Sequence, residues 1–403
     1  MSRRVLITLV PVLLAAPLPA QVADPHLDVA RRVLRTTPLV DGHNDLPWAI
    51  RTDPAARGDV AAYDLRQRTP GHTDIARLRQ GMVGGQFWSV YVPGDYADSG
   101  YARVQLEEID IARRIIERYP DVFELALTAA DVRRIFAAGR IPSLLGMEGG
   151  HVLENSLGAL RAYYDLGARY LTLTHNVTLD WADAASGPAR HQGLTEFGRQ
   201  VVREMNRLGM LVDLSHVSPA VMSQALTASQ APVIFSHSNA RALANHVRNV
   251  PDSILRRLPA NGGVVMVTFV PGFVSQPLID HGAAQAAIRQ AAAARLGSDT
   301  AGVRRAVEAW RAENPPPRAT LGQVADHIQY IRTVAGVDHV GIGGDFDGIT
   351  DVVLGLEDVS TYPALFAELS RRGWTEAELR KLAGENVLRA LEAAEAVARR
   401  LRQ

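Results

Sequence analysis

Cysteine is absent from this chain of 403 residues. Its absence excludes a disulfide framework, a thiolate nucleophile, a Cys-ligated zinc ion and lipidation at sulfur. A dominant charge is missing as well, because 43 basic side chains balance 43 acidic ones. Bulk charge therefore gives no attraction to nucleic acid or to an anionic membrane surface. We expect a globular protein stabilised by its hydrophobic core alone, which a chain of this length is able to bury.

An apolar run long enough to cross a bilayer is also missing. The run Val5–Ala16 falls short of the roughly 20 residues that a membrane span needs, and Pro11 interrupts it. Arg3-Arg4 precedes this run and small residues follow it to Ala23, which is the order typical of a secretory signal peptide. We therefore expect a signal peptide over residues 1–23 and a periplasmic or secreted mature protein with no stable membrane anchor. The alternative is that this segment stays on the protein as an uncleaved membrane anchor.

Beyond the signal, short apolar runs alternate with segments of 3.6-residue periodicity. The predicted strands are 38–45, 82–92, 141–148, 170–175, 210–216, 232–237, 263–269 and 339–345. Helices are predicted at 104–118, 156–166, 195–208 and 321–334, and Ser218-Pro219 is typical of the start of another. Eight such units predict a closed (β/α)8 TIM barrel as a single domain over 24–403, with a doubly wound open sheet as the alternative. The alanine-rich region within 271–318 predicts an added helical segment over the rim.

Six of the eight predicted strands end in a side chain able to bind a metal or transfer a proton. These side chains are His43 with Asp45, Glu148, His175, His216, His237 and Asp345. Residues i and i+2 of a strand point to one face, so His43 and Asp45 are able to share a cation. Barrel active sites are built at the C-terminal ends of the strands, where all these residues are expected to meet.

Imidazole and carboxylate ligands without thiolate suit zinc, manganese or iron. With ligands from several strands, two ions about 3.5–4 Å apart are expected, and Glu148, alone on its strand, is the natural bridging carboxylate. A water molecule between two such ions supplies hydroxide near neutral pH. His151 lies just beyond a strand, which favours a supporting role, and His339 begins its strand at the opposite end of the barrel. The remaining histidines lack this setting and are interpreted as ordinary: His26, His72, His191, His246, His281 and His327.

Several motifs in a fixed order resemble the membrane (renal-type) dipeptidase family, peptidase family M19, whose members are binuclear zinc enzymes of the amidohydrolase-like barrels. The resemblance spans essentially the whole mature chain. The motifs are Asp41-Gly42-His43-Asn44-Asp45, Gly149-Gly150-His151 after Glu148, Leu173-Thr174-His175-Asn176, Trp181-Ala182-Asp183, Ser215-His216, Ser236-His237-Ser238, Arg248-Asn249-Val250-Pro251 and Gly343-Gly344-Asp345-Phe346-Asp347-Gly348.

The resemblance implies two Zn2+ ions per chain. His43 and Asp45 correspond to ligands of one ion and His216 and His237 to ligands of the other, with Glu148 bridging them. Most other barrels of this superfamily carry His-x-His at the first strand and a carboxylated lysine as the bridge. The His-x-Asp pair and the glutamate of this chain are what the dipeptidase branch uses.

The resemblance also implies a hydrolase of the EC 3.4.13 type, a metallo-dipeptidase in which a metal-bridged hydroxide attacks the peptide bond of a dipeptide. His175 corresponds to the residue that polarises the scissile carbonyl group, and Arg248 to the residue that holds the free carboxylate of the substrate. Asp345 corresponds to the group that handles the proton passed to the leaving amine, with Asp347 behind it. Family members often tolerate a D-residue at the C-terminal position, and some open β-lactams.

The chain departs from the animal members because it lacks every cysteine and a lipid-anchor tail. Their disulfides and membrane tethering therefore do not carry over, and a homodimer would rest on noncovalent contacts.

Two alternatives remain. One is a related binuclear hydrolase of another amide, lactone, β-lactam or phosphoester, which Arg248 disfavours because neutral substrates carry no carboxylate. The other is a binding protein without catalysis, which Asp345 disfavours because a binder needs no acid-base group.

Overall fold

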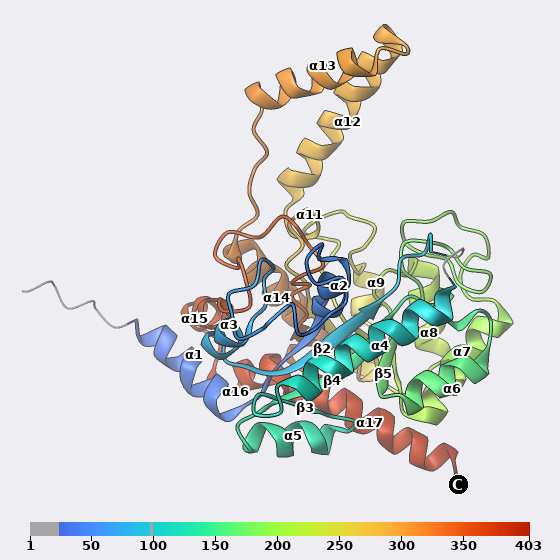
Figure 1. The fold of residues 1–403 in the computed structure, drawn as a ribbon, viewed down its shortest axis with the longest axis vertical. Helices are drawn as coiled ribbons and strands as arrows, with labels where there is room; N and C mark the ends of the chain where they lie inside the picture. The colour runs from blue at the N-terminus through green and yellow to red at the C-terminus, as the bar shows by residue number, and fades with distance from the viewer. Residues whose placement is uncertain (1–23, 97–99) are drawn as a thin grey trace, which may run out of the picture.

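Eight parallel strands form a closed barrel in the computed structural model, which describes residues 24–96 and 100–403 (Figure 1). The strands are β1 (Leu39–Asn44), β2 (Val83–Tyr91), β4 (Ile141–Glu148), β5 (Ala168–Thr172), β6 (Leu211–Asp213), β7 (Val233–Phe235), β8 (Val264–Val267) and β9 (Val340–Ile342). They follow one another in the order β2-β1-β9-β8-β7-β6-β5-β4, and a pairing between β2 and β4 closes the cylinder. The predicted (β/α)8 barrel is confirmed, and the open-sheet alternative is wrong. The predicted signal peptide lies outside the described residues.

Helices surround this barrel and cover the outer face of its strands (Figure 1). Their bounds are α1 (Pro25–Thr36), α2 (Leu46–Thr52), α3 (Ile75–Gln80), α4 (Tyr101–Arg118), α5 (Ala129–Ala137), α6 (Leu157–Asp165), α7 (Glu196–Leu208), α8 (Pro219–Ala228), α9 (Asp252–Leu255), α10 (Leu258–Asn261), α11 (Pro271–Val274), α12 (Gln276–Leu296), α13 (Thr300–Glu313), α14 (Leu321–Ala335), α15 (Tyr362–Arg371), α16 (Glu376–Arg380) and α17 (Asn386–Leu401). Three short turns complete the set: η2 (Gly150–Leu153), η3 (Val337–His339) and η4 (Lys381–Glu385). Helix α8 begins as predicted, because the Ser218 side chain accepts a hydrogen bond from the Val221 N–H.

The barrel strands carry apolar side chains on both faces, as buried parallel strands do. Inside the barrel, residues such as Val40, Leu144, Ile234 and Met266 pack in one cluster with Leu391 and its neighbours on α17. Helix α17 lies at the N-terminal end of the barrel, because Arg389 donates a hydrogen bond to the carbonyl oxygen of Gly262, just before β8. That end of the barrel is therefore closed by apolar packing.

A short additional strand, β3 (Phe123–Leu125), pairs with the beginning of β4 and was not predicted. Three residues are too few to show a hydrophobic period, so such a strand becomes visible only through its pairing. Several predicted strands also end earlier than expected. The barrel strand β6 stops at Asp213, β7 at Phe235 and β9 at Ile342.

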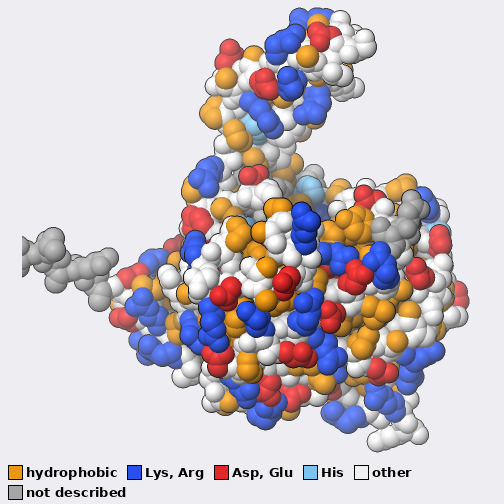
Figure 2. Space-filling view, viewed as in Figure 1, with side chains coloured by type: hydrophobic (Ala, Val, Ile, Leu, Met, Phe, Trp, Pro, Cys, Tyr) orange, Lys and Arg blue, Asp and Glu red, His pale blue; other side chains and the backbone are white. Residues whose placement is uncertain are grey.

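Helices α12 and α13 project from the barrel, and they lie within residues 271–318, where an added helical segment was expected (Figure 1, top). They pack mainly on each other, so that Ala292 is the one buried residue of α12. Acidic and basic side chains are intermixed over this projection and over the visible face of the barrel (Figure 2). Among residues 24–96 and 100–403, no helix combines the length and the apolar character that crossing a bilayer would need.

Candidate metal centre and active site

A cavity of about 820 Å³ opens at the C-terminal end of the barrel. Its lining includes most of the predicted site residues, namely Asp45, Glu148, His175, His216, His237, Arg248 and Asp345, and His43 lies directly beneath them, 3.3 Å from Asp45. The structure thus brings all the predicted site residues together.

The site residues do not all lie in the strands, which corrects the expected strand ends. His216, His237 and Asp345 follow β6, β7 and β9 by two or three residues. His216 and Asp345 have positive φ angles of 67° and 65°, in the left-handed region that most residues avoid. Both residues line the cavity just after their strands end.

One half of the site is built by His43 and Asp45. The Nε2 atom of His43 lies 3.3 Å from Oδ2 of Asp45 and 3.5 Å from Oε2 of Glu148. Asp45 stands just before α2, in the position of a helix cap, yet its side chain makes no capping hydrogen bond. Both side chains are buried, and within the described part of the chain Nε2 of His43 and Oδ1 of Asp45 have no hydrogen-bond partner.

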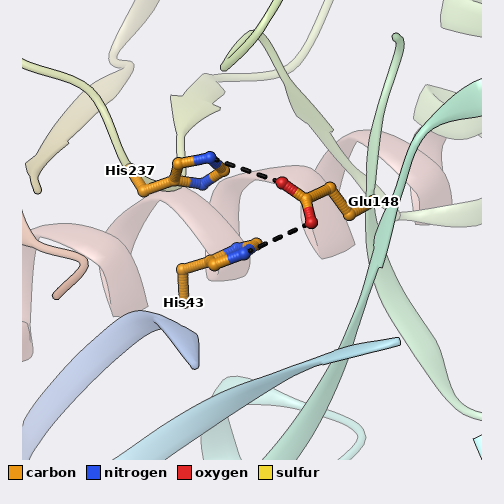
Figure 3. A group of neighbouring side chains, drawn as sticks. All are labelled: His43, Glu148 and His237. Atoms are coloured by element: carbon orange, nitrogen blue, oxygen red, sulfur yellow. Dashed lines mark ion pairs between the residues drawn. The ribbon is translucent and has the colours of Figure 1, made fainter. Parts of the chain in front are cut away.

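The other half is built by His216 and His237. Their Nε2 atoms lie 2.8 Å apart, and both face Oε1 of Glu148, at 3.0 Å and 3.4 Å respectively. Figure 3 shows Glu148 between two imidazoles, with one carboxylate oxygen toward His43 and the other toward His237. Each oxygen of the carboxylate therefore faces a different half of the site.

Three groups of side chains at this site have ligand atoms close enough to hold an ion. They are His43, Glu148 and His237; Glu148, His175 and His216; and His43, Asp45 and Asp345, each with its atoms within 4.8 Å of one another. Glu148 and His43 each belong to two groups. Carboxylate oxygens and imidazole nitrogens gathered at such short distances form a set of ligands that suits a metal cation. The donor set thus fits metal ions, and the overlap of the groups fits more than one.

The charges at the site shift the titration of its carboxyl groups. Burial opposes ionisation of Glu148, but the imidazoles of His43 and His175 hold the pKa of its carboxyl well below its usual range. Burial, together with the neighbouring carboxylates of Asp45 and Glu148, raises the pKa of Asp345 well above its usual range. The pKa values of two carboxyl groups in one cavity are thereby shifted in opposite directions.

Arg248 is buried to 2% exposure beside this cluster. Its Nη2 atom donates a hydrogen bond of 3.4 Å to the carbonyl oxygen of His237, whereas Nε and Nη1 have no partner among the described residues. The guanidinium lies over the ring of Phe273 at 5.3 Å. Burial lowers its pKa to about 10, so it remains a cation at neutral pH. A buried cation with two unused donors is a site for an anion.

His175 lies at the edge of the cluster, with its Nε2 atom 4.0 Å from Oε1 of Glu148. The ring of Tyr91 packs against it at 4.7 Å, and both side chains line the cavity.

His151 belongs to none of the three groups of candidate ligands. Its Nε2 atom lies 2.8 Å from the carbonyl oxygen of Val92, and burial lowers its pKa to about 4.

Some residues of the site escaped prediction. His246 was interpreted as ordinary, yet it lines the cavity and stacks on Phe273 at 4.5 Å. Trp48 and Asn176 also line it. Asn176 follows His175 in a quoted motif and Trp48 lies three residues after Asp45, but neither side chain titrates, so residue type gave no signal. His246 and Phe273 lie on separate segments, and only the fold brings them together.

A parallel barrel that gathers imidazoles and carboxylates at its open end has the ligands of a metal-dependent enzyme, and comparison with known proteins identifies its kind. Residues 27–403 match the family model of the membrane dipeptidases, peptidase family M19, and the chain belongs to this family. The resemblance expected from the motifs is thus confirmed, and the chain is a metallo-dipeptidase by family.

Solved structures agree with this assignment. The probable dipeptidase PvdM from Pseudomonas aeruginosa is 24% identical with a TM-score of 0.79, and the match covers 93% of this chain and 99% of that one. The metallopeptidase dipeptidase AC of family M19 is 29% identical with a TM-score of 0.72, over 89% and 99% of the two chains. A metallopeptidase from Rhodobacter sphaeroides, liganded with a phosphinate mimic of the dipeptide L-Ala-D-Ala, is 28% identical with a TM-score of 0.70, again over 89% and 99%.

Proposed function

We propose that this chain is a dipeptidase that holds two Zn2+ ions, one at His43 and Asp45 and the other at His216 and His237, with Glu148 between them. One observation carries the proposal: the acceptor cluster and the Arg248 guanidinium, whose Nε and Nη1 have no partner among the described residues, line one cavity. The cluster suits cations, and the guanidinium suits an anion. A dipeptide is a substrate with a carboxylate close to its only peptide bond.

The metal ions would lower the pKa of a bound water molecule toward neutrality and polarise a carbonyl oxygen. The absence of cysteine favours a site of histidine and carboxylate ligands, which zinc accepts readily. Arg248 would receive the C-terminal carboxylate on its unused N–H groups, as charge-assisted hydrogen bonds. Because Arg248 is beside His237, a peptide longer by one residue would misplace its carboxylate relative to the metal centre.

His175 and Asp345 would act on the reacting bond. His175 faces the cavity from the edge of the cluster, where its imidazole would hydrogen-bond the carbonyl oxygen as negative charge develops on it. Asp345 lines the same cavity, and its Oδ1 lies 3.9 Å from Nε2 of His43. From there its carboxyl would transfer a proton to the leaving amine.

A D-residue at the C-terminal position is part of the proposal. The Rhodobacter sphaeroides relative is liganded with a mimic of L-Ala-D-Ala, and it is 28% identical over 89% of this chain. We also propose that residues 24–403 act as one domain after export to the periplasm or the medium, with residues 1–23 as the signal peptide.

The test is hydrolysis of a panel of dipeptides by the purified chain, with and without a chelator. We expect cleavage of L-Ala-L-Ala and L-Ala-D-Ala, loss of both activities in the chelator, and recovery on addition of Zn2+. Tripeptides and dipeptide amides serve as controls, and neither is expected to be cleaved efficiently. If no dipeptide is cleaved in a chelator-sensitive way, the proposal is wrong. Metal analysis of the active protein should give two zinc ions per chain.

A further inference from the structure

Three imidazoles belong to the proposed zinc ligands, those of His43, His216 and His237. In each of them the Nδ1 atom lies within hydrogen-bond distance of a neighbouring side chain. The Nδ1 atom of His43 lies 2.9 Å from the hydroxyl of Tyr170. The Nδ1 atom of His216 lies 3.1 Å from Oδ1 of Asn176, and that of His237 lies 2.8 Å from the hydroxyl of Ser236. In all three, Nδ1 faces one of these partners, and Nε2 faces Glu148.

The direction of the hydrogen bond at His237 follows from a buried carboxylate behind it. Asp213 is fully buried, and Ser236 Oγ lies 2.6 Å from its Oδ2. The carboxylate also accepts from the Thr172 hydroxyl at 2.5 Å and from the backbone N–H groups of Ser215 and Ser236. All these partners donate, so the Ser236 hydroxyl gives its proton to Asp213. Its oxygen then accepts from Nδ1–H of His237.

The same reasoning applies to the other two imidazoles. The hydroxyl of Tyr170 lies 3.2 Å from the carbonyl oxygen of Gly42, which is able only to accept. Tyr170 therefore donates to Gly42 and accepts from Nδ1–H of His43. The Oδ1 atom of Asn176 is likewise an acceptor, so His216 also carries its proton on Nδ1.

In a neutral imidazole, a proton held on Nδ1 leaves the lone pair on Nε2, so these bonds direct the lone pairs of the neutral rings toward the centre. The Nε2 atoms of His216 and His237 are 2.8 Å apart, and two lone pairs at this distance repel each other unless a cation lies between them. The partners on Nδ1 thus favour an arrangement of the two rings that a bound metal ion would stabilise.

We propose that Tyr170, Asn176 and Ser236, the last backed by Asp213, are positioning residues that hold the three imidazoles with Nε2 turned toward the metals and so set the metal affinity. This inference rests on the proposed metal sites. The effect should be largest at His237, because only there does a carboxylate stand behind the partner. Partners of this kind raise the basicity of the ligand and fix its ring, and their loss typically weakens metal binding about 10–100-fold.

The test measures Zn2+ binding to the full, metal-stripped chain by competition with a chromophoric chelator, so it does not depend on activity. We expect Ser236→Ala to weaken the affinity for one of the two ions about 10–100-fold, and Ser236→Thr to restore it. Thr172→Val is the matched control. It also removes one hydroxyl bond to the Asp213 carboxylate, within the same buried network, but it touches no imidazole. Its zinc affinity should stay at the wild-type value.

A second variant addresses the other half of the site. Tyr170→Phe keeps the buried ring and removes only the hydroxyl, and it should weaken zinc binding at His43 by a smaller factor than Ser236→Ala. In wild-type protein carrying 15N-labelled histidine, the nitrogen shifts should show Nδ1 protonated in all three imidazoles.

Two results would overturn the inference while leaving the proposed function intact. In one, the wild-type chain binds two zinc ions and both Ser236→Ala and Tyr170→Phe bind them equally well. In the other, Thr172→Val loses as much affinity as Ser236→Ala, which would make the network purely structural. A wild-type chain that binds no zinc would instead overturn the proposed function, and this inference with it.

Discussion

Asp45 stands directly before helix α2 without capping it, and its carboxylate lies instead 3.3 Å from Nε2 of His43. Aspartate at this position usually accepts a hydrogen bond from the first helical turn, which stabilises a helix by about 1 kcal/mol. Here Asp45 makes no such bond. The Leu46 N–H donates instead to Oδ1 of Asn44 at 2.9 Å, and the Asp45 carboxylate belongs to the site.

Asp45→Asn follows from this relationship. We expect the variant to lose one of its two metal ions and most of its activity. The metal-free variant should be at least as stable as the metal-free wild type, because a buried negative charge is removed and no cap is lost. Metal analysis and thermal unfolding of the stripped proteins check both parts. A clear loss of stability in the stripped variant would show that Asp45 supports the fold itself.

Arg248→Gln tests the recognition of the carboxylate. Truncation of one partner of a buried, hydrogen-bonded charge pair costs about 2–5 kcal/mol, so kcat/KM for a dipeptide should fall at least about 30-fold. Hydrolysis of the corresponding dipeptide amide, which we expect to be slow in the wild type, should change little because the amide offers no carboxylate. Equal losses on both substrates would mean that Arg248 acts on the metal centre rather than on the substrate.

Asp345→Asn separates proton transfer from metal binding. Asp345 is not one of the five proposed zinc ligands, so the variant should retain both ions. Its turnover should fall by about 10²–10⁴, the usual contribution of a general acid or base. Metal content and steady-state kinetics on one dipeptide are sufficient measurements. Full activity would remove Asp345 from the mechanism.

Glu108 of α4 should make stability depend on pH. Its side chain is fully buried, and burial raises its pKa to about 8 even though Arg51 lies 3.4 Å away. The folded state thus holds the proton more tightly than the unfolded state, whose carboxyl titrates near its model value of 4.5. The stabilisation is complete below pH 4.5 and is lost as the pH rises through about 8.

Glu108→Gln should remove this dependence. Arg51 keeps its second partner, Glu107, at 2.6 Å, so the substitution leaves no unpaired cation. Denaturant unfolding should find the variant close to the wild type at pH 5 and more stable than it at pH 9. If both proteins lose stability equally between these values, the titrating group lies elsewhere.

The barrel could be predicted from the chain because each of its units carries its own signal. Short apolar runs and amphipathic segments alternate, and their number and order define parallel strands joined by helices. The candidate ligands were found for the same reason: a histidine or carboxylate after an apolar run is a visible break in pattern. The strand β3 and the left-handed turns at His216 and Asp345 leave no such break, since pairing partners and φ angles depend on contacts far along the chain.

Local order in the chain was thus enough to specify the barrel, the dipeptidase family and the residues with metal-binding chemistry. His43 and Asp45 are visible as a pair because two positions on one segment suffice to bring them together. Packing between segments far apart in the chain decides two further features of the site. It buries Arg248 with Nε and Nη1 unpaired among the described residues, and it places Asp213 behind Ser236 and His237. Such relations exist only after the barrel closes, because hydrogen bonding and burial are properties of neighbours in space.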